Sequence, residues 1–300
     1  MTTEMKIKAI APWFGGKRNL APRIVEQLGP HRYYCEPFCG GISVLLAKNP
    51  AGIEVVNDLH GEVTNLARVI QSDQAYDLYE RLARTSFCEG LYQDCRQRWI
   101  EGGLEDPVDR AYDFFVVSWM GRNGMSGTQR SKYPFQMVKR FSPNGGDGAV
   151  RFRNAIDSLP AWHQRLRKVT IFNMDGLELL NNLHDEPRVV VYADPPYLMS
   201  GQRDSKTHYE HEFGQGDFFG DGLDDHARLA QTLNRFDDVR VIVSYYNEPR
   251  LDELYPPDKW EKMIIPVDKV IGYSTRSGRE VRKAEEVLLI NGPIFEKAAV

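Results

Sequence analysis

Hydrophobic residues along the chain form short apolar runs that alternate with amphipathic segments. Short apolar runs are typical of strands buried in a parallel sheet. They occupy Tyr33–Glu36, Ile53–Asn57, Val169–Asn173, Val189–Asp194, Val239–Ser244 and Val287–Asn291. Helical periodicity between these runs predicts helices at Ala21–Leu28, Ile42–Ala47, Leu177–Leu183 and Asp225–Arg235. The alternation predicts an α/β fold with a mostly parallel sheet and helices on both faces.

The alternation stops between about Val63 and Arg165. This stretch begins with a helical pattern, Leu66–Leu82, and continues into a polar, glycine-rich and aromatic middle, Arg122–Phe152, in which strand and turn patterns mix. We therefore predict two domains, with residues 63–165 inserted into an α/β domain formed by residues 1–62 and 166–300.

Composition favours a soluble enzyme over a bare binding module. The chain has 300 residues, of which 42% are hydrophobic, enough for a large α/β domain with an insertion. No apolar run approaches the roughly 20 residues of a membrane span, and Met1–Ile10 lacks the pattern of a signal peptide, so we expect a cytoplasmic protein. Cys35, Cys39, Cys88 and Cys95 show neither zinc-site nor disulfide-framework spacing, which predicts free thiols.

Charge is distributed unevenly along the chain. The net charge is −4, but Met120–Thr170 contains ten cations and two anions, which leaves −12 for the remainder. A basic segment in an acidic protein is typical of a nucleic-acid-binding face, and a solvated basic surface without a partner explains it equally well.

Candidate chemistry follows three of the predicted strands, where ligands bind in doubly wound sheets. Glu36-Pro37-Phe38-Cys39-Gly40-Gly41 turns through two glycines into a helix, without the spacing of a dinucleotide fingerprint. This turn is either a ligand-binding loop or an ordinary strand-to-helix turn. Asp58 follows the next strand, where a carboxylate either binds ribose hydroxyls or caps a helix.

The third strand end is Asp194-Pro195-Pro196-Tyr197. Two prolines remove two backbone donors and fix φ, so this turn offers free carbonyl acceptors. A carboxylate, free carbonyls and an aromatic ring together suit a flat ring that carries an amino group. The alternative is a rigid turn with a packed tyrosine.

These motifs and their order resemble those of the Dam-type DNA adenine-N6 methyltransferases, the alpha class of amino-methyltransferases. The resemblance extends over nearly the whole chain. It rests on Trp13-Phe14-Gly15-Gly16-Lys17, Glu36–Gly41, Asn57-Asp58, the insertion and Asp194–Tyr197, and Arg122-Asn123-Gly124 is similar to the tripeptide that opens the family's DNA-reading hairpin. One departure is Ile42, which stands where many members have a second glycine.

The resemblance implies a Rossmann-like S-adenosylmethionine-dependent methyltransferase sheet with an inserted, mainly helical DNA-recognition domain that carries a β-hairpin. Residues 1–62 and 166–300 would form the catalytic domain, and residues 63–165 the target-recognition domain. The cofactor would be S-adenosyl-L-methionine and the partner double-stranded DNA. No metal or membrane is implied, and we expect a monomer or a weak dimer.

Cofactor-binding roles follow by motif. Trp13 and Lys17 would close over the methionine end of the cofactor, which Phe38, Gly40 and Gly41 would line. Asp58 would bind the ribose, and Asp194 would lie against the reacting end. Asp175 would lie near the adenine of the cofactor, or cap the helix that follows it.

In the catalytic motif, Asp194 and the Pro195 carbonyl would accept the two N–H groups of the target amine, with Pro196 stiffening the turn. Because that amine lies inside the duplex stack, the base must be flipped out, and Tyr197 would stack on it. In the insertion, Arg122, Asn123 and Arg130 would contact base edges and Lys132, Lys139 and Arg140 phosphates. A second basic loop, Arg276–Lys283, would touch the DNA backbone, and the long segment Gly201–Asp224 would close on the base.

Three alternatives remain at this point. Cytosine-N4 methyltransferases favour Ser in place of Asp194. Protein glutamine methyltransferases have Asn there and would have no use for a basic insertion. A DNA-binding relative without catalytic activity would keep the insertion but need not keep an intact Asp194–Tyr197 motif.

Overall fold

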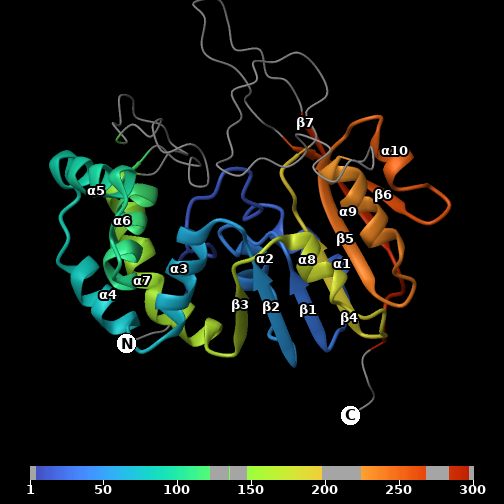
Figure 1. The fold of residues 1–300 in the computed structure, drawn as a ribbon, viewed down its shortest axis with the longest axis horizontal. Coiled ribbons are helices and arrows are strands. Elements are labelled where there is room, and N and C mark those ends of the chain that lie inside the picture. Colours follow the sequence, from blue (N-terminus) through green and yellow to red (C-terminus); the bar gives the residue numbers. More distant parts are fainter. Residues whose placement is uncertain (1–4, 122–134, 136–146, 198–223, 268–283, 297–300) are drawn as a thin grey trace, which may run out of the picture. The chain divides into compact units, whose positions relative to one another are not determined.

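The computed structural model describes residues 5–121, 135, 147–197, 224–267 and 284–296 (Figure 1). Its helices are α1 (Ala21–Leu28), α2 (Ser43–Ala47), α3 (Gly61–Gln71), α4 (Ala75–Ala83), α5 (Glu89–Glu101), α6 (Pro107–Met120), α7 (Gly148–Leu166), α8 (Gly176–Asn181), α9 (Asp225–Asn234) and α10 (Leu251–Leu254). Its strands are β1 (Tyr33–Glu36), β2 (Ile53–Asn57), β3 (Val169–Phe172), β4 (Val189–Ala193), β5 (Arg240–Tyr246), β6 (Glu261–Val267) and β7 (Ala284–Asn291).

The seven strands have the order β3-β2-β1-β4-β5-β7-β6. β2 and β3 pair in parallel, as do β1 with β4 and β4 with β5. β7 is antiparallel to both β5 and β6. The prediction of a mostly parallel α/β sheet is therefore confirmed, and β6 is a strand that the hydrophobic pattern did not predict.

The described chain divides into two compact units. Unit 1 contains residues 5–25 and 39–175, and unit 2 contains residues 26–38, 176–197, 224–267 and 284–296. The boundaries of these compact units differ from the predicted boundaries of the catalytic and target-recognition domains, which lie at residues 62 and 166. The predicted domains were defined by function, and they stay a prediction.

Unit 1 contains β2, β3 and the helices α3 to α7, which are gathered together in Figure 1. α6 packs on α3 and α5, and α7 packs on α3, α4 and α6. Two of these helices start at aspartates whose side chains accept backbone N–H bonds: Asp106 from Val108 and Asp109, and Asp147 from Ala149. In the part of the chain that the structure describes, the insertion is helical, as expected.

The helical prediction for Leu66–Leu82 is confirmed, and the stretch belongs to two helices. α3 ends at Gln71, and the next residue, Ser72, has an extended backbone and a hydroxyl that accepts the N–H of Gln74, which starts a turn. The prediction of mixed strand and turn up to Phe152 was wrong at its end, because α7 begins at Gly148. Its N-cap, Asp147, was a sequence feature that could have indicated this start.

A buried ion-pair cluster fastens α7 to β2 within unit 1. The Glu54 carboxylate accepts from Lys48 Nζ at 2.5 Å and from Arg165 Nη1 and Nη2 at 2.5 and 2.7 Å. Burial acts to raise the pKa of Glu54, but hydrogen bonds from Arg165 and Lys48 outweigh it and leave the pKa below its ordinary value. Removing the Glu54 carboxylate would take the counter-ion from the buried Lys48 ammonium, a change that typically costs about 3–5 kcal/mol.

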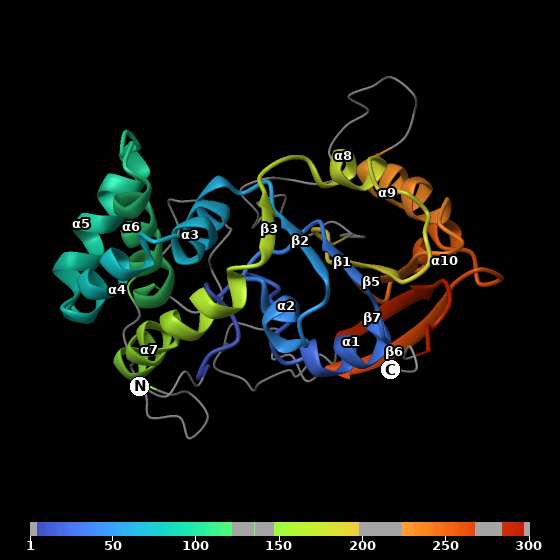
Figure 2. The ribbon, with the colours of Figure 1, turned by 90° about the horizontal axis from the view of Figure 1, so that it is seen from below.

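Unit 2 has a core built on the strands β1, β4, β5 and β7. Apolar side chains of these strands pack with residues of α8, α9 and α10 and with Trp260. Figure 2 shows α8 and α9 lying on the same side of β5. α9 begins where the side chain of Asp224 accepts the N–H of Ala227. The rigid strands position the residues that follow them, which are the candidate site.

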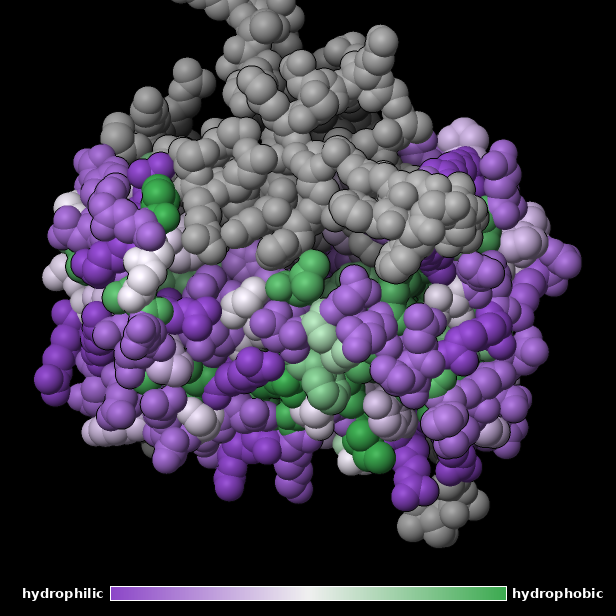
Figure 3. Space-filling model, in the orientation of Figure 1, coloured by the Kyte–Doolittle hydropathy of each residue, from purple (hydrophilic) through white to green (hydrophobic). Residues whose placement is uncertain are grey.

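The described surface in Figure 3 is mainly hydrophilic, with smaller apolar areas. The large apolar side chains that are exposed include Ile53, Leu59, Tyr76, Phe172 and Ile264. None of the described helices is long and apolar enough to cross a membrane.

Candidate functional site

Unit 1 holds the glycine turn in a tight arrangement. Gly40 has φ of 45°, and a Cβ atom built on it would lie 2.5 Å from Cδ1 of Trp13. A Cβ atom on Gly41 would lie 2.6 Å from the carbonyl oxygen of Ala11. Both positions therefore require glycine, because Trp13 and the Ala11 carbonyl come too close to the turn for any side chain to fit.

Asp58 ties this turn to the end of β2. Its Oδ2 accepts the N–H of Gly40 at 2.7 Å, and its Oδ1 accepts the N–H of His60 at 2.9 Å. Both carboxylate oxygens of Asp58 thus accept a backbone N–H, which fixes the carboxylate beside Gly40 and His60. The suggestion that Asp58 caps a helix was wrong: the N-cap of α3 is His60, whose Nδ1 accepts the N–H of Val63.

The departure at Ile42 has a structural consequence. Ile42 precedes α2 with φ of 53° and ψ of 33°, the left-handed region that glycine adopts without strain. A β-branched residue is a clear outlier there. Its side chain is nevertheless fully buried, with 0% exposure, so apolar burial holds the backbone in a strained conformation.

Trp13 and Lys17 lie in the N-terminal turn of unit 1. Trp13 is half-buried and meets His60 edge-on, with 5.2 Å between ring centroids. Lys17 is buried, and its Nζ donates to the carbonyl of Gly15 at 2.7 Å. Leu59, next to Asp58, is 49% exposed and was not predicted as a site residue. The structure thus brings together Trp13, Gly40, Gly41 and Asp58, as the motifs predicted.

Phe38 belongs to unit 2, where its ring packs against Gly176 at the start of α8. A Cβ atom on Gly176 would lie 2.6 Å from Cε1 of Phe38. Phe38 itself is half-buried against the core of unit 2. Asp175, the last residue of unit 1, is exposed, and its predicted role stays a prediction.

Asp194-Pro195-Pro196-Tyr197 follows β4 directly, as predicted. Pro195 is buried, and Asp194, Pro196 and Tyr197 are half-buried. Tyr197 meets Tyr246 edge-on, with 4.4 Å between ring centroids, and lies 6.0 Å from Tyr245. Both partners belong to β5, which pairs in parallel with β4. The carboxyl ends of two neighbouring strands therefore assemble an aromatic wall beside the Asp-Pro-Pro turn.

The field around this turn is negative. Burial raises the pKa of Tyr197 well above its ordinary value, and the charges of Asp194 and Glu286 raise it further. Burial and the charges of Asp194, Glu36 and Glu286 likewise raise the pKa of Tyr192. A cluster of carboxylates near one point stabilises positive charge that develops there.

Several residues of this cluster were not predicted. Glu286 is 4% exposed and lies on β7 opposite Tyr246. Tyr246 ends β5, and Glu36 is 2% exposed and accepts from the Tyr34 hydroxyl at 2.8 Å. A charged residue inside an apolar strand is the one sequence feature that could have indicated Glu36 and Glu286.

Several predicted residues lie outside the described part of the chain. These are Arg122, Asn123, Arg130, Lys132, Lys139, Arg140, and the residues of the segments 201–223 and 276–283. The four cysteines are free, as expected; Cys88 is exposed and the other three are buried.

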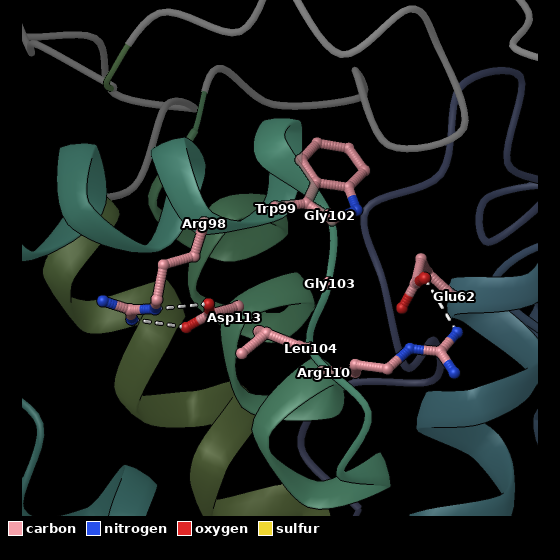
Figure 4. Close-up of a pocket in the computed structure, with 8 residues that line it drawn as sticks. All are labelled: Glu62, Arg98, Trp99, Gly102, Gly103, Leu104, Arg110 and Asp113. Carbon is pink, nitrogen blue, oxygen red and sulfur yellow. Dashed lines mark hydrogen bonds and ion pairs between the residues drawn. The ribbon is translucent and has the colours of Figure 1, made fainter.

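A small recess of about 70 Å³ lies among α3, α5 and α6 in unit 1 (Figure 4). Two ion pairs line it, Arg98 with Asp113 at 2.7 Å and Arg110 with Glu62 at 2.8 Å. Sites for drug-sized ligands are typically about 300–1,000 Å³, so the recess is too small for a cofactor of that size. Among the described residues, no three His, Cys, Asp or Glu side chains are grouped to hold a metal ion.

Comparison with solved structures gives only distant likenesses. Precorrin 8W decarboxylase of Methanobacterium thermoautotrophicum is 11% identical, with a TM-score of 0.35 over 92% of this chain and 89% of that one. A protein of Listeria monocytogenes assigned as a class I S-adenosylmethionine-dependent methyltransferase is 10% identical, with a TM-score of 0.37 over 95% of this chain and 62% of that one. Likenesses at this level do not establish a common fold. No curated protein has significant sequence similarity to the chain.

The family comparison is decisive. The model of the D12 class N6 adenine-specific DNA methyltransferases matches residues 13–269. The match begins at Trp13 and includes the glycine turn, Asp58, the insertion and the Asp194–Tyr197 motif. The chain belongs to the D12 class of N6 adenine-specific DNA methyltransferases, enzymes that use S-adenosylmethionine to methylate adenine in DNA.

Proposed function

We propose that this enzyme methylates the N6 amine of an adenine flipped out of duplex DNA, with Asp194-Pro195-Pro196-Tyr197 binding the base. The observation that carries the proposal is the arrangement at the carboxyl end of β4. There a half-buried carboxylate, a proline-stiffened turn and an aromatic ring occur together in a negative field.

The residues of unit 1 fit S-adenosylmethionine. Gly40 and Gly41 let the turn pack closely against Trp13 and the Ala11 carbonyl, and a glycine turn that follows a strand of a doubly wound sheet lies where ligands bind in such sheets. The Asp58 carboxylate at the strand end is the acceptor that we assign to the ribose hydroxyls, and Leu59 offers an exposed apolar side chain beside it. We assign Trp13, Lys17, Gly40, Gly41 and Asp58 of unit 1 to cofactor binding. Asp175 and, from unit 2, Phe38 and Asp194 complete the assignment.

The chemistry assigned to the chain is orientation and electrostatic stabilisation. When bound, S-adenosylmethionine supplies an electrophilic methyl group on a positively charged sulfur. The N6 lone pair of adenine is delocalised into the ring, so the amine is a weak nucleophile. Hydrogen bonds from its two N–H groups to the Asp194 carboxylate and the Pro195 carbonyl localise that lone pair.

In the transfer the S–C bond would break as the C–N bond forms, and positive charge would grow on N6 until one of its protons leaves. The Asp194 carboxylate, as the acceptor of that N–H group, would stabilise the charge and receive the proton, which then passes to water. Tyr197 provides a face on which the extruded purine stacks, and Tyr246 holds the Tyr197 ring from its edge.

The insertion, residues 63–165, is assigned to DNA. The support is the charge of its second half and of the residues that follow, since Met120–Thr170 contains ten cations against two anions. We propose a role in base contacts for Arg122, Asn123 and Arg130, and in phosphate contacts for Lys132, Lys139 and Arg140. We further propose that the substrate is duplex DNA and that the enzyme acts as a monomer or a weak dimer.

The test is methyl transfer from labelled S-adenosylmethionine to duplex DNA, with chromatography of the digested product. We expect N6-methyladenine; N4-methylcytosine would instead support the cytosine alternative. Asp194→Ala should lower kcat by at least about 10³-fold, because the amine loses its charged acceptor. Circular dichroism should remain that of the wild type.

Asp258→Ala, which removes an exposed carboxylate of the same unit, is the matched control and should leave kcat unchanged. If Asp194→Ala transfers methyl groups at the wild-type rate, the mechanism is wrong. If Asp258→Ala loses as much activity as Asp194→Ala does, the enzyme requires negative charge in general rather than the Asp194 carboxylate.

A further inference from the structure

The inserted helices hold the N-terminal segment Ile7–Trp13 by its backbone. Nε1 of Trp119, on α6, donates to the carbonyl of Ile10 at 3.0 Å, and Nε1 of Trp162, on α7, donates to the carbonyl of Ile7 at 2.7 Å. The N–H of Ile7 donates to Oγ of Ser158 at 3.1 Å. The backbone of this segment is therefore satisfied by helices that lie more than a hundred residues later in the sequence.

The same segment supports the glycine turn. The N–H of Ile10 donates to the carbonyl of Gly41 at 3.1 Å. The carbonyl of Ala11 and the indole of Trp13 occupy the space that side chains at Gly41 and Gly40 would need. A shift of the segment Ile7–Trp13 must therefore move the glycine turn as well, because the two are in close-packed contact.

A second connection runs through aromatic rings. Phe114, on α6 and 0% exposed, lies 5.7 Å from the ring of His60, which meets Trp13 edge-on at 5.2 Å. The backbone N–H of His60 also donates to Asp58. His60 thus contacts the helix, the tryptophan and the carboxylate at once.

An ion pair fixes α6 near the same place. Arg110 Nη2 donates to Oε1 of Glu62 at 2.8 Å across the recess shown in Figure 4. Nδ2 of Asn65 donates to the carbonyl of Pro107, the first residue of α6, at 2.9 Å. The start of α3, which directly follows Asp58 and His60, is therefore fastened to α6 at several points.

We propose that His60 and Phe114 are positioning residues that set Trp13 and the glycine turn for S-adenosylmethionine. Through them and through Trp119, the cofactor and DNA each strengthen the binding of the other. This coupling between cofactor and DNA binding rests on the proposed assignment of the insertion to DNA. Coupling between two binding sites is reciprocal, so the factor by which DNA raises the affinity for the cofactor equals the factor by which the cofactor raises the affinity for DNA. Neither residue touches the reacting atoms in this assignment.

The probe is S-adenosylhomocysteine, titrated by calorimetry with and without a DNA duplex that contains the enzyme's methylation site. Phe114→Leu removes the ring that contacts His60 and Trp99, and His60→Asn removes the imidazole while keeping a residue that caps helices well. Each should weaken binding of the probe by about three- to tenfold. The ratio of affinities with and without DNA should fall toward one.

The matched control is Phe152→Leu, which removes an equally buried ring inside the inserted helices that contacts Phe87 and Phe115. It should lower the melting temperature to a similar extent but change probe affinity by less than about twofold. Steady-state kinetics should show a raised KM for S-adenosylmethionine in Phe114→Leu and His60→Asn, with kcat retained at saturation.

Equal effects of Phe114→Leu and Phe152→Leu on probe affinity would overturn the positioning role. If both positioning variants bind the probe as the wild type does, the inference is also wrong. A wild type that binds the probe but not DNA would overturn the coupling and the assignment of the insertion. A wild type that does not bind the probe would overturn the cofactor site itself. Should Phe114→Leu fail to fold, His60→Asn decides the outcome.

Discussion

The carboxylate of Asp58 accepts a hydrogen bond from the backbone N–H of Gly40, with 2.7 Å between the atoms. The two residues belong to different motifs, 18 positions apart, and the bond joins them into one structure. Because its other carboxylate oxygen accepts the N–H of His60, Asp58 holds the glycine turn against the start of α3. Asp58, which we assign to ligand binding, therefore also stabilises the local backbone structure.

Substitutions at Asp58 test this double role. Asp58→Asn should not behave conservatively, because one amide oxygen can serve only one of the two N–H groups and the NH₂ group opposes the other. We expect both Asp58→Asn and Asp58→Ala to weaken S-adenosylhomocysteine binding by at least about tenfold. Calorimetry measures the affinity. An Asn variant with wild-type affinity would contradict the geometry described for Gly40 and His60.

Ile42 makes a prediction about backbone strain. Both Ile42→Ala and Ile42→Gly lose a buried side chain, which costs about 2–5 kcal/mol. At a left-handed position, however, the glycine variant should be the more stable of the two by about 1 kcal/mol. Urea unfolding compares them. The same pair at Val44, inside α2, should show the opposite order, since glycine is unfavourable in a helix.

His226 makes stability depend on pH. This residue of α9 is 3% exposed, and its Nδ1 lies 3.0 Å from the Tyr245 hydroxyl. Burial lowers the pKa of His226 to about 4. The negative charges of Asp224 and Asp225 act to raise this pKa, whereas the positive charge of Arg250 lowers it further. The folded state keeps the ring neutral, whereas the unfolded chain takes up a proton below about pH 6.5.

The contribution of His226 is therefore present above about pH 6.5 and is lost as the pH falls to about 4. Over that range it should reduce the free energy of unfolding by about 3 kcal/mol. Urea unfolding at a series of pH values measures this. His226→Gln should flatten the curve by that amount, and His184→Gln, at an exposed position, should not. Identical curves for the wild type and His226→Gln would refute the burial effect.

Lys139 tests the assignment of phosphate contacts. Lys139→Ala should weaken binding to all DNA sequences by a similar factor and reduce the slope of log affinity against log salt by about one. Fluorescence anisotropy at several salt concentrations gives that slope. A loss confined to one DNA sequence would instead show that Lys139 reads bases.

Much of the fold followed from apolar periodicity. The strands at Tyr33, Ile53, Val169 and Val189 begin where the pattern placed them, because each is a compact apolar run. Three of them are mostly buried, and β3, at the edge of the sheet, is partly exposed. β6 escaped prediction because polar and apolar residues mix in it and Pro266 interrupts it. Such a strand gains its pairing from β7, a partner that no local pattern reveals.

The candidate site was predictable where a motif follows a strand. Gly40, Asp58 and Asp194 occupy the expected strand ends. His60 and Tyr246 were missed because their roles depend on rings contributed by distant segments, Trp13 and Tyr197. One histidine or tyrosine in a sequence is more often an ordinary packed residue than part of a site. Only the tertiary contacts distinguish the two cases.

The path of the chain limits how this enzyme can be taken apart. The polypeptide passes from one compact unit to the other at Val25–Glu26, at Phe38–Cys39 and again at Asp175–Gly176. A single cut at any point therefore leaves parts of both units on at least one of the two fragments. Isolating unit 1 would require a linker that joins Val25 to Cys39, so point substitutions are the more direct way to separate the roles of the two units.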